Sequence, residues 1–342
     1  MGQIKIGING FGRIGRNAFK IAFERNDVEV VAINDLFNPE VLAYMLKHDS
    51  NYGTYEKEIT FGNNEIIVDG KIIKAFSENS PGSIPWGGLG VDVVIESTGQ
   101  FTTKDNALKH IEAGAKRVVV GNSIDSEDID TIIIGVNEEL LKQDIEVISN
   151  ATPTTNSIAA ILSVLDGEFG VQKSLLTTIH SYTSSQKLTD HPFRNFREGR
   201  NAAENIVPSV TGATTALKKV LPQFGDKFDG LSVRVPTPVV SLSDLTVLLG
   251  RNTTIEEIND VITNASKEPY YQGIIDINNE LLVSRDYIGN SHSGVVDLKL
   301  TKLVDGNLAK IMVWYDNEWG FGNRLVELAV DAGRTLYKDN IK

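Results

Sequence analysis

The stretch IKIGINGFGRIGR, residues 4–16, decides the fold of this chain. A β-branched apolar run is followed directly by the glycine pattern G-x-G-x-x-G, and a helix-period stretch continues to about residue 25. VEVVAIND, residues 28–35, is a second apolar run. A strand, a tight turn, a helix and a strand in this order form a βαβ unit, which predicts a parallel sheet.

The three glycines of this pattern have distinct expected roles in binding a dinucleotide. Gly10 permits the tight turn, Gly12 lets the backbone approach a pyrophosphate, and Gly15 lets the helix pack on the strand. Asp35 ends the second strand, where a carboxylate can accept hydrogen bonds from the ribose hydroxyls. That carboxylate would repel a 2′-phosphate, and the Leu and Phe that follow it bring no cation. We therefore expect NAD rather than NADP.

Composition narrows the classes of protein that fit. The 342 residues are 41% hydrophobic and 23% charged, as in a soluble globular protein with room for two domains. A net charge of -12 opposes binding to nucleic acid or to an anionic membrane. No apolar run is long enough to span a bilayer, so we expect a cytoplasmic protein. The absence of cysteine excludes disulfides and cysteine nucleophiles, and the five histidines lack metal-ligand spacing, so we expect no metal.

Further runs complete a two-part pattern. VDVVIEST and KRVVVG read as buried parallel strands with the helix DNALKHIEAGA between them. After residue 150, the long alternating runs at 231–249 and 293–315 indicate a largely antiparallel sheet with one covered face. Residues 321–337 have helical spacing. The sequence thus predicts an α/β protein with a Rossmann domain and an α+β domain that contains a mixed, largely antiparallel sheet.

Several motifs together resemble one family. GINGFGRIGR, VDVVIESTGQFT, VISNA, TTNSIAAIL, TTIHSYTSSQK, RVPTP and WYDNEWGFGNR are similar, in the same order, to phosphorylating glyceraldehyde-3-phosphate dehydrogenase. The resemblance implies a Rossmann domain formed by residues 1–151 and 317–342, and a catalytic domain formed by residues 152–316. It also implies an oxidoreductase that forms a homotetramer, with a loop like residues 181–205 lying across a neighbour's cofactor site.

The resemblance implies an NAD site that is nearly complete. Ser97, Thr98 and Gly99 resemble the turn beneath the adenine and ribose, and Asn317 resembles the residue that bonds the nicotinamide carboxamide. The full implied set of cofactor-binding residues is Gly10, Phe11, Gly12, Arg13, Ile14, Gly15, Asp35, Ser97, Thr98, Gly99 and Asn317. One segment departs: the chain has Gly-Asn-Ser at residues 121–123 where the family often has Ser-Ala-Pro.

The resemblance also implies a site for a small phosphorylated substrate. Thr183 and Arg234 resemble the residues that hold the substrate's C3 phosphate, and His180 resembles the general base. The site for attacking inorganic phosphate would be formed by Thr152, Thr154, Thr211, the backbone N–H of Gly212, and Arg197 or Arg200.

Pro153 stands where the family has its nucleophilic cysteine, and Ser157 stands at the second cysteine of the family's C-T-T-N-C pattern. Thr152 is a good N-cap, and proline suits the first helical position, so a helix should begin here. Proline offers neither a nucleophile nor an amide hydrogen for an oxyanion. We therefore expect ordinary phosphorylating activity to be nearly absent.

Two functions of different classes remain open. In the first, the protein transfers a hydride between NAD and a phosphorylated aldehyde, its hydrate or a related compound, without a covalent intermediate. In the second, it is a catalytically inactive NAD-binding pseudoenzyme with a regulatory or assembly role. Retention of His180, Thr183 and Arg234 favours the first, because a pure NAD sensor needs no substrate base.

Overall fold

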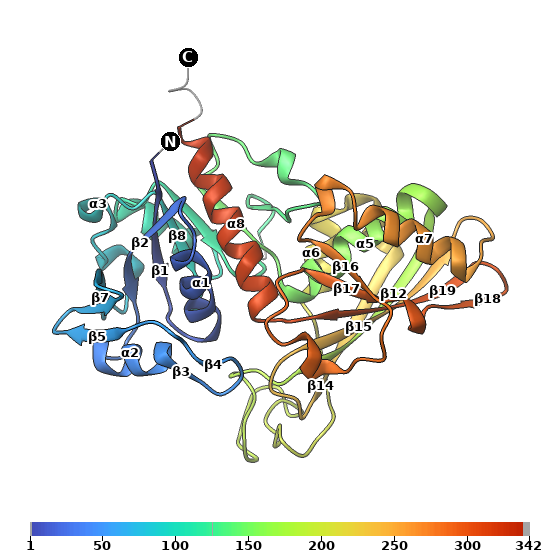
Figure 1. Cartoon of the computed structure of the whole chain (residues 1–342), viewed down its shortest axis with the longest axis horizontal. Coiled ribbons are helices and arrows are strands. Elements are labelled where there is room, and N and C mark those ends of the chain that lie inside the picture. The colour runs from blue at the N-terminus through green and yellow to red at the C-terminus, as the bar shows by residue number, and fades with distance from the viewer. Residues whose placement is uncertain (1, 125, 338–342) are drawn as a thin grey trace. The chain divides into compact units, whose positions relative to one another are not determined.

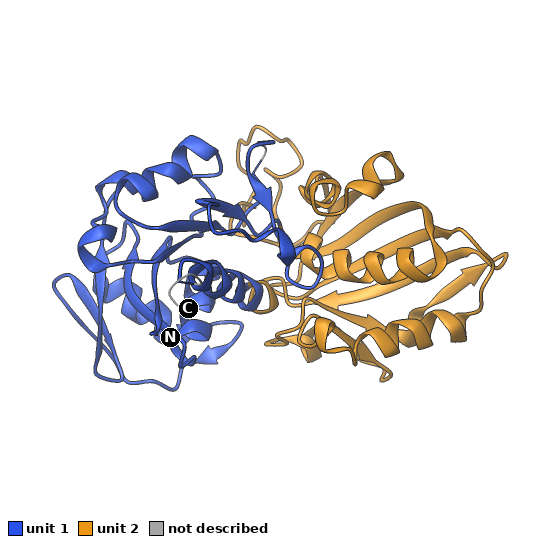
Figure 2. Ribbon diagram, turned by 90° about the horizontal axis from the view of Figure 1, so that it is seen from above, with its two compact units in different colours: residues 1–151, 322–342 blue, residues 152–321 orange. Residues whose placement is uncertain are grey.

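A computed structural model describes residues 2–124 and 126–337 of the chain. It divides into two compact units, coloured separately in Figure 2: unit 1 spans residues 1–151 and 322–342, and unit 2 spans residues 152–321. The second boundary falls within the last helix, α8 (Trp319–Thr335). Figure 1 labels most of the helices and strands of both units.

Unit 1 is built on a nine-stranded sheet. In spatial order its strands are β10 (Asp130–Thr131), β11 (Val147–Ser149), β9 (Arg117–Val120), β8 (Val93–Glu96), β1 (Ile4–Asn9), β2 (Val28–Asn34), β7 (Lys71–Phe76), β6 (Glu65–Val68) and β5 (Ile59–Gly62). The strands from β10 to β7 pair in parallel, as predicted for β1, β2, β8 and β9, and β6 and β5 add an antiparallel edge. A separate short ribbon joins β3 (His48–Asp49) to β4 (Gly53–Thr54).

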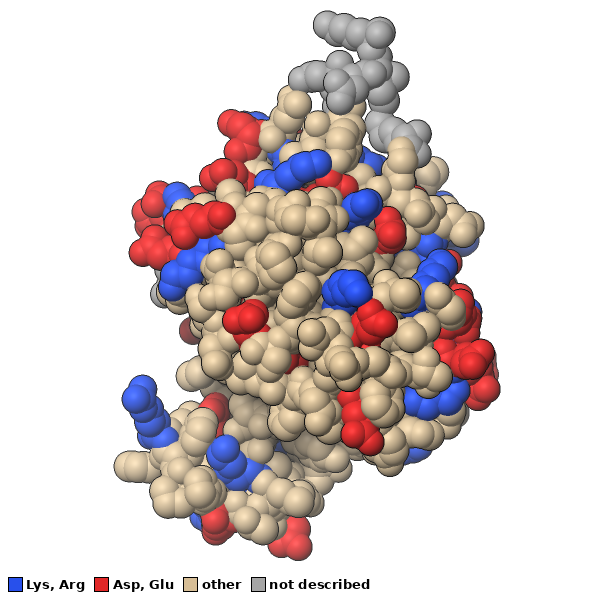
Figure 3. Space-filling view, turned by 90° about the vertical axis from the view of Figure 1, so that its left-hand side faces the viewer, with Lys and Arg blue, Asp and Glu red and all other residues tan. Residues whose placement is uncertain are grey.

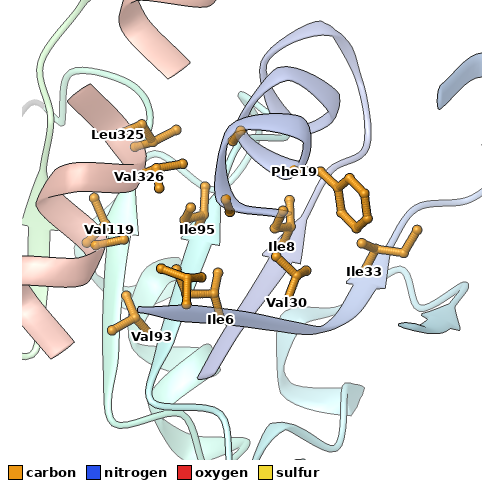
Figure 4. Packing of buried hydrophobic residues seen from close by; sticks show 14 of the residues in the cluster. Ile6, Ile8, Phe19, Val30, Ile33, Val93, Ile95, Val119, Leu325 and Val326 are labelled. Carbon is orange, nitrogen blue, oxygen red and sulfur yellow. The ribbon is translucent and has the colours of Figure 1, made fainter. Parts of the chain in front are cut away.

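Helices follow the strands of unit 1. They are α1 (Arg13–Phe23), α2 (Pro39–Lys47), α3 (Trp86–Leu89), α4 (Lys104–Glu112) and most of α8, with short 3-10 turns η1 (Pro81–Ser83) and η2 (Glu138–Leu140). Apolar side chains of β1, β2, β8 and β9 meet those of α1 and α8 in one core, in which Ile6, Ile8, Phe19 and Leu325 are fully enclosed (Figure 4). This is the Rossmann arrangement predicted from the glycine pattern.

The strand order of unit 1 defines a ligand-binding edge. Strand β1 has β2 on one side and β8 on the other: the chain leads from β1 to β2 and β7 on one side and later crosses to β8 on the other. In open α/β sheets, ligands bind outside the carboxyl ends of the strands at such a switch point. The glycine loop, Asp35 and the Ser97–Gly99 turn all follow the carboxyl ends of these strands.

Unit 2 is built on a second, mixed sheet. Its order is β13 (Val207–Ser209), β14 (Phe228–Val235), β12 (Val171–Ser181), β15 (Ser241–Leu249), β19 (Leu308–Tyr315), β17 (Gly294–Asp297) and β16 (Ile275–Asn278), and β18 (Lys302–Val304) also pairs with β19. Most pairs are antiparallel, whereas β12–β14 and β16–β17 are parallel. The predicted mixed, largely antiparallel sheet is confirmed.

Strict alternation in β15 and β19 places one set of side chains in the core and the other on the opposite face. Helix α5 (Pro153–Phe169) packs against β15 and β19 and also contacts α6 (Ala213–Val220) and α7 (Ile255–Ala265). Short 3-10 turns complete unit 2: η3 (Pro222–Lys227), η4 (Pro269–Tyr271), η5 (Ser284–Tyr287) and η6 (Leu298–Leu300).

Charged residues are dispersed on the surface that Figure 3 presents, where Lys and Arg lie interspersed with Asp and Glu. Within residues 2–124 and 126–337, no helix combines the length and the apolar character needed to cross a membrane.

Candidate functional site

The glycine loop of unit 1 has the geometry of a pyrophosphate cradle. Gly10 has φ of +90°, and a Cβ on it would lie 2.7 Å from the backbone nitrogen of Thr98. A Cβ on Gly15 would overlap the carbonyl oxygen of Gly10, so this glycine permits the close packing of helix on loop. A Cβ on Gly12 would meet nothing within 4 Å. The open space above Gly12, at the N-cap of α1, is where a bound pyrophosphate would face free helix N–H groups.

Asp35 lies beside this cradle. Its Oδ2 accepts the backbone N–H of Phe11 at 2.8 Å, which ties the loop to the end of β2. The second carboxylate oxygen remains for the ribose hydroxyls that the sequence predicted. Leu36 and Phe37, which follow, are 58% and 63% exposed and bring no cation to this edge. The arrangement fits an NAD ribose and opposes a 2′-phosphate.

Arg13 and Ile14 follow the loop at the start of α1. Arg13 forms an ion pair with Asp49 at 2.6 Å, and its guanidinium lies over the ring of Tyr52. Ile14 is half-buried and packs against the core of unit 1. Their predicted contacts with the cofactor remain predictions.

The turn after β8 adjoins the same loop. Ser97 Oγ donates to the carbonyl oxygen of Gly10 at 2.8 Å, and Gly99 has φ of +71°. The divergent segment at residues 121–123 is a neighbour, since a Cβ on Gly99 would lie 3.8 Å from Asn122 Nδ2. The structure therefore brings the predicted adenine turn and the divergent segment together at one edge of the sheet.

In unit 2, α5 begins at Pro153 as predicted. Thr152 is the N-cap, and its Oγ1 accepts the backbone N–H of Thr155 at 3.0 Å. Proline suits the first helical position because its missing N–H would have no intrahelical partner. The helix therefore presents no side-chain nucleophile and no amide hydrogen at this position.

The hydroxyls near Pro153 are all engaged. Thr154 Oγ1 hydrogen-bonds the Tyr315 hydroxyl at 2.9 Å, and Thr178 Oγ1 lies 2.8 Å from the same hydroxyl. Ser157 Oγ donates to the carbonyl oxygen of Thr154 at 2.8 Å and lies 3.2 Å from Ser243 Oγ. Burial raises the pKa of Tyr315, so its hydroxyl stays protonated at neutral pH.

His180 and Arg234 lie at the carboxyl ends of the neighbouring parallel strands β12 and β14, directly opposite each other. The carbonyl oxygen of Ser181 lies 2.8 Å from His180 Nδ1 and 3.3 Å from Arg234 Nη1. Because a carbonyl only accepts, Nδ1 carries the proton of the neutral ring, and Nε2 is left with its lone pair. The pair therefore offers a proton acceptor beside a cation.

Burial, reinforced by the charge of Arg234, lowers the pKa of His180 to about 3. The ring is therefore neutral at pH 7, as a base must be, yet it is a weak base in the unliganded protein. An anion paired with Arg234 would cancel part of the cation's effect and raise the pKa of His180. Substrate binding would thus strengthen the base.

The other predicted phosphate ligands lie in loops and at a helix end. Thr183 Oγ1 lies 2.9 Å from Ser185 Oγ, and Thr211 Oγ1 accepts the N–H of Ala213 at 3.2 Å at the start of α6. Gly212 is the exposed N-cap of that helix. Thr211 and Gly212 stand at the N-terminus of α6, whereas Thr183 lies in the loop after β12, and the phosphate-binding role of all three remains a prediction.

The choice between Arg197 and Arg200 also stays open. Both side chains are exposed, and Arg200 pairs with Asp190 at 3.0 Å. In the described part of the chain, no hydrogen bond or ion pair joins either arginine to Thr211. The intervening Glu198 accepts a hydrogen bond from Ser209 Oγ, and its charge acts on Arg234.

Asn317 belongs to unit 2, although it was predicted within the cofactor domain. Its Oδ1 accepts hydrogen bonds from Ser241 Oγ at 3.1 Å and Ser181 Oγ at 3.2 Å. The amide nitrogen is therefore the end that remains to donate to a ligand carbonyl, as required for a nicotinamide carboxamide.

Sequence reasoning missed Tyr315 and Ser181, which link α5, β12 and β19 and orient the predicted site residues. Both lie inside motifs quoted above, WYDNEWGFGNR and TTIHSYTSSQK. The signal for Tyr315 is its inward position in an alternating strand, because a buried tyrosine hydroxyl needs a partner. In the described residues, no group of three or more His, Asp or Glu side chains could hold a metal ion.

Comparison with known proteins bears on both units. Residues 4–104 match the family model "Glyceraldehyde 3-phosphate dehydrogenase, NAD binding domain", and residues 152–317 match "Glyceraldehyde 3-phosphate dehydrogenase, C-terminal domain". Glyceraldehyde-3-phosphate dehydrogenase 2 of Streptomyces avermitilis is 48% identical over 337 residues, which cover 97% of this chain and 99% of that protein. Glyceraldehyde-3-phosphate dehydrogenase of Geobacillus stearothermophilus is 45% identical over 327 residues, 95% of this chain and 97% of that protein.

Proposed function

The chain belongs to the glyceraldehyde-3-phosphate dehydrogenase family, and we propose that it oxidises a phosphorylated aldehyde, through its hydrate, without an acyl-enzyme intermediate. Its cofactor is NAD, which accepts the hydride when bound. The observation that carries the proposal is Pro153 at the start of α5 together with the His180–Arg234 pair, because Tyr315 links the two: its hydroxyl contacts Thr154 and its ring contacts His180.

The engaged hydroxyls around Pro153 support a reaction without covalent catalysis. A serine or threonine nucleophile needs an adjacent base, whereas Thr154 Oγ1 is bonded to Tyr315 and Ser157 Oγ to the Thr154 carbonyl. The chain contains no cysteine. Water added to the aldehyde carbon gives the hydrate, in which a second hydroxyl takes the place that a thiol sulfur would occupy in a covalent intermediate.

The roles of the unit 2 residues follow from their charges and protonation states. Arg234 and Thr183 bind the substrate phosphate, and Arg234 contributes the forked guanidinium that suits it. His180 Nε2 accepts a proton from a hydroxyl of the aldehyde hydrate as the C–H bond gives up its hydride. The carbon is oxidised, NAD is reduced, and the product is a carboxylic acid rather than an acyl phosphate.

The homotetramer and the cytoplasmic location that the resemblance implies are part of the same proposal. The surface that we expect to be covered in the oligomer lies on the sheet formed by β14, β12, β15 and β19, which is labelled in Figure 1. Its outer side carries exposed apolar residues, among them Leu175 and Leu231.

A turnover assay with and without phosphate tests the proposed reaction. Purified protein is mixed with NAD and glyceraldehyde 3-phosphate or other phosphorylated aldehydes, and the nicotinamide absorbance is followed. We expect reduction of NAD at a rate that does not depend on added inorganic phosphate. His180→Asn should lower the rate by about a hundred-fold or more, since general bases contribute about 10²–10⁴-fold. His48→Asn, an exposed histidine in unit 1, is the matched control.

Two results would contradict the proposal in different ways. A rate that requires inorganic phosphate would indicate acyl-enzyme chemistry by a nucleophile other than cysteine. No turnover with the whole panel, together with NAD and phosphate-ester binding by calorimetry, would instead favour the pseudoenzyme. The low pKa of His180, about 3, is the observation that favours that alternative, because a weak base is a poor catalyst at pH 7.

A further inference from the structure

We propose that Glu96 is a buried positioning residue on which hydrogen bonds converge from both sides, and that it holds the glycine loop and the Thr98 turn in the geometry that binds NAD. Glu96 is the last residue of β8 and is 1% exposed. No ligand contact is assigned to it. The proposal rests on the NAD site and does not depend on the reaction proposed above.

One side of the converging chain starts at Trp86. Its indole Nε1–H donates to His110 Nδ1 at 3.0 Å, and His110 Nε2 lies 3.0 Å from Glu96 Oε2. An indole nitrogen only donates, so Nδ1 must accept and Nε2 must carry the ring proton. His110 therefore donates to Glu96 and cannot accept from it. Trp86 and His110 are both fully buried, so water does not supply an alternative partner.

The other side starts at the main chain of Glu78, just beyond β7. Its backbone N–H donates to Asn34 Oδ1 at 2.8 Å, and its carbonyl oxygen accepts from Asn34 Nδ2 at 3.0 Å, so the main chain of Glu78 determines which end of the Asn34 amide is the nitrogen. Asn34 Nδ2 donates to Asn9 Oδ1 at 2.8 Å, and Asn9 Nδ2 in turn donates to Glu96 Oε2 at 2.5 Å. Because a backbone N–H cannot be reversed, the orientation of both asparagine amides is determined by this end.

The two sides meet on one carboxylate. Oε2 receives Asn9 and His110, while Oε1 receives the backbone N–H of Thr98 at 2.7 Å and the Thr98 hydroxyl at 2.5 Å. The side chain of Asn9, the ring of His110 and the backbone of Thr98 can only donate at these contacts, so an amide in place of the carboxylate would set its nitrogen against one of these donors. A carboxylate offers an acceptor oxygen at each of the four contacts.

These hydrogen bonds lie at the edge of the sheet where the cofactor is expected to bind. Asn9, Asn34 and Glu96 are the last residues of β1, β2 and β8, the three strands around the switch point. Gly10, the first residue of the glycine loop, follows Asn9 and donates its N–H to the Asn34 carbonyl at 2.8 Å. Asn9 and Asn34 therefore both hold the start of the loop. The Thr98 hydroxyl donates to Glu96 and accepts from the Gln100 N–H, so Glu96 also determines the shape of the adenine turn.

The test combines an isosteric change at Glu96 with two changes at His110 that have opposite expected consequences. Glu96→Gln keeps the shape but places an amide donor against existing donors. His110→Gln keeps the polarity, because its amide oxygen can accept from Trp86 and its amide nitrogen can donate to Glu96. His110→Leu removes both hydrogen bonds. The dissociation constant for NAD is measured by titration calorimetry, first on the unmodified protein and then on each variant, with thermal unfolding followed separately.

Asp92→Asn is the matched control. Asp92 is 4% exposed and lies just before the amino end of β8, where it accepts hydrogen bonds from the Lys5 N–H at 3.0 Å and from Lys116 Nζ at 2.7 Å. It is therefore a buried carboxylate at the opposite end of β8 from Glu96. Its loss should lower the unfolding temperature without moving the cofactor loop.

We expect Glu96→Gln and His110→Leu to raise the NAD dissociation constant by about tenfold or more, since each leaves buried donors unpaired. His110→Gln and Asp92→Asn should leave it within about twofold. An unchanged constant in Glu96→Gln would overturn the proposal, as would an equal loss of affinity in Asp92→Asn. If Glu96→Gln does not fold, the two His110 variants test the proposal instead. Equal NAD affinities in His110→Gln and His110→Leu would overturn the proposal. Failure of the unmodified protein to bind NAD would instead contradict the cofactor assignment.

Discussion

The hydroxyl of Tyr315 lies 2.9 Å from Thr154 Oγ1 and thereby joins the last residue of β19 to the first turn of α5. Thr178 Oγ1, on β12, contacts the same hydroxyl at 2.8 Å. The imidazole of His180 packs edge-on to the Tyr315 ring, with 6.1 Å between ring centroids. One buried tyrosine therefore positions both the residue after Pro153 and the strand that carries the base.

Tyr315→Phe should lower the free energy of unfolding by about 1–3 kcal/mol, because it leaves two buried threonine hydroxyls without their partner. Urea unfolding measures this change. Tyr182→Phe, at a tyrosine that is 37% exposed, is the control and should change stability by less than about 0.5 kcal/mol. Equal effects of the two changes would mean that the Tyr315 hydroxyl does not stabilise unit 2.

His180 should make the protein less stable in mild acid. Burial, with the charge of Arg234, lowers its pKa from 6.5 to about 3 in the folded state, so the unfolded chain takes up a proton first as the pH falls. Its neutral form therefore favours folding above about pH 6.5, and this contribution is lost between about pH 6.5 and pH 3.

Urea unfolding of the unmodified protein and of His180→Asn at pH 7 and pH 5 measures this contribution. The loss of unfolding free energy between the two pH values should be about 2 kcal/mol smaller in the variant. His48→Asn should behave as the unmodified protein does. An identical loss in His180→Asn would show that the folded-state pKa of His180 is close to its unfolded value.

Asp35 should determine the choice of dinucleotide. Its carboxylate opposes a 2′-phosphate, so calorimetry should show NAD binding about tenfold or more tightly than NADP. Asp35→Ser should weaken NAD binding and narrow or reverse this preference. Glu29→Gln, at an exposed position near the start of β2, should leave both affinities unchanged. Equal or tighter binding of NADP by the unmodified protein would refute the prediction.

The outer side of the unit 2 sheet should be covered in a homotetramer. Leu175 is 62% exposed and Leu231 is 45% exposed on this sheet, a costly exposure for an isolated chain. Light scattering at micromolar concentration should give four times the chain mass of 37.4 kDa. Leu175→Asp with Leu231→Asp should lower the mass, whereas Leu281→Asp, at an 86% exposed position, should not. A single-chain mass for the unmodified protein would contradict this prediction.

Pro153→Cys should introduce phosphate-dependent activity with glyceraldehyde 3-phosphate. The new thiol would stand at the N-terminus of a 17-residue helix, where the helix dipole favours the thiolate. We expect activity on the order of hundreds-fold below an adapted enzyme, because the surroundings were not selected for this thiol. Pro153→Ser is the control and should remain inactive in the phosphate-dependent assay.

Iodoacetamide labelling separates two failures of Pro153→Cys. Fast labelling without turnover would mean that the thiol is activated but the substrate does not fit. Labelling no faster than a free thiol, in a variant that folds and binds NAD, would show that the site no longer activates a thiol for reaction with glyceraldehyde 3-phosphate.

Local patterns were enough to predict the Rossmann half of the chain. The β1–α1–β2 unit, the strands β8 and β9 and the NAD loop follow from short-range rules, because hydrophobic period and glycine geometry act within a few residues. The start of α5 at Pro153 was predictable for the same reason, since Thr152 and proline specify a helix N-terminus by themselves. The absence of cysteine, read directly from the sequence, excluded thiol chemistry.

Only the tertiary structure decided which polar groups meet. Strand β12 inserts between β14 and β15, which are consecutive in the chain, and this insertion places His180 opposite Arg234. Apart from the local contacts of Thr98 with Glu96, the Tyr315 network and the convergence on Glu96 join residues that are between 14 and 161 positions apart in the sequence. No periodicity encodes such pairs, because a buried hydrogen bond depends on the direction of donors and acceptors that the packed sheet brings together. The ring nitrogens of His110 and His180 that donate follow from those directions, and the low pKa of His180 follows from its burial beside a cation.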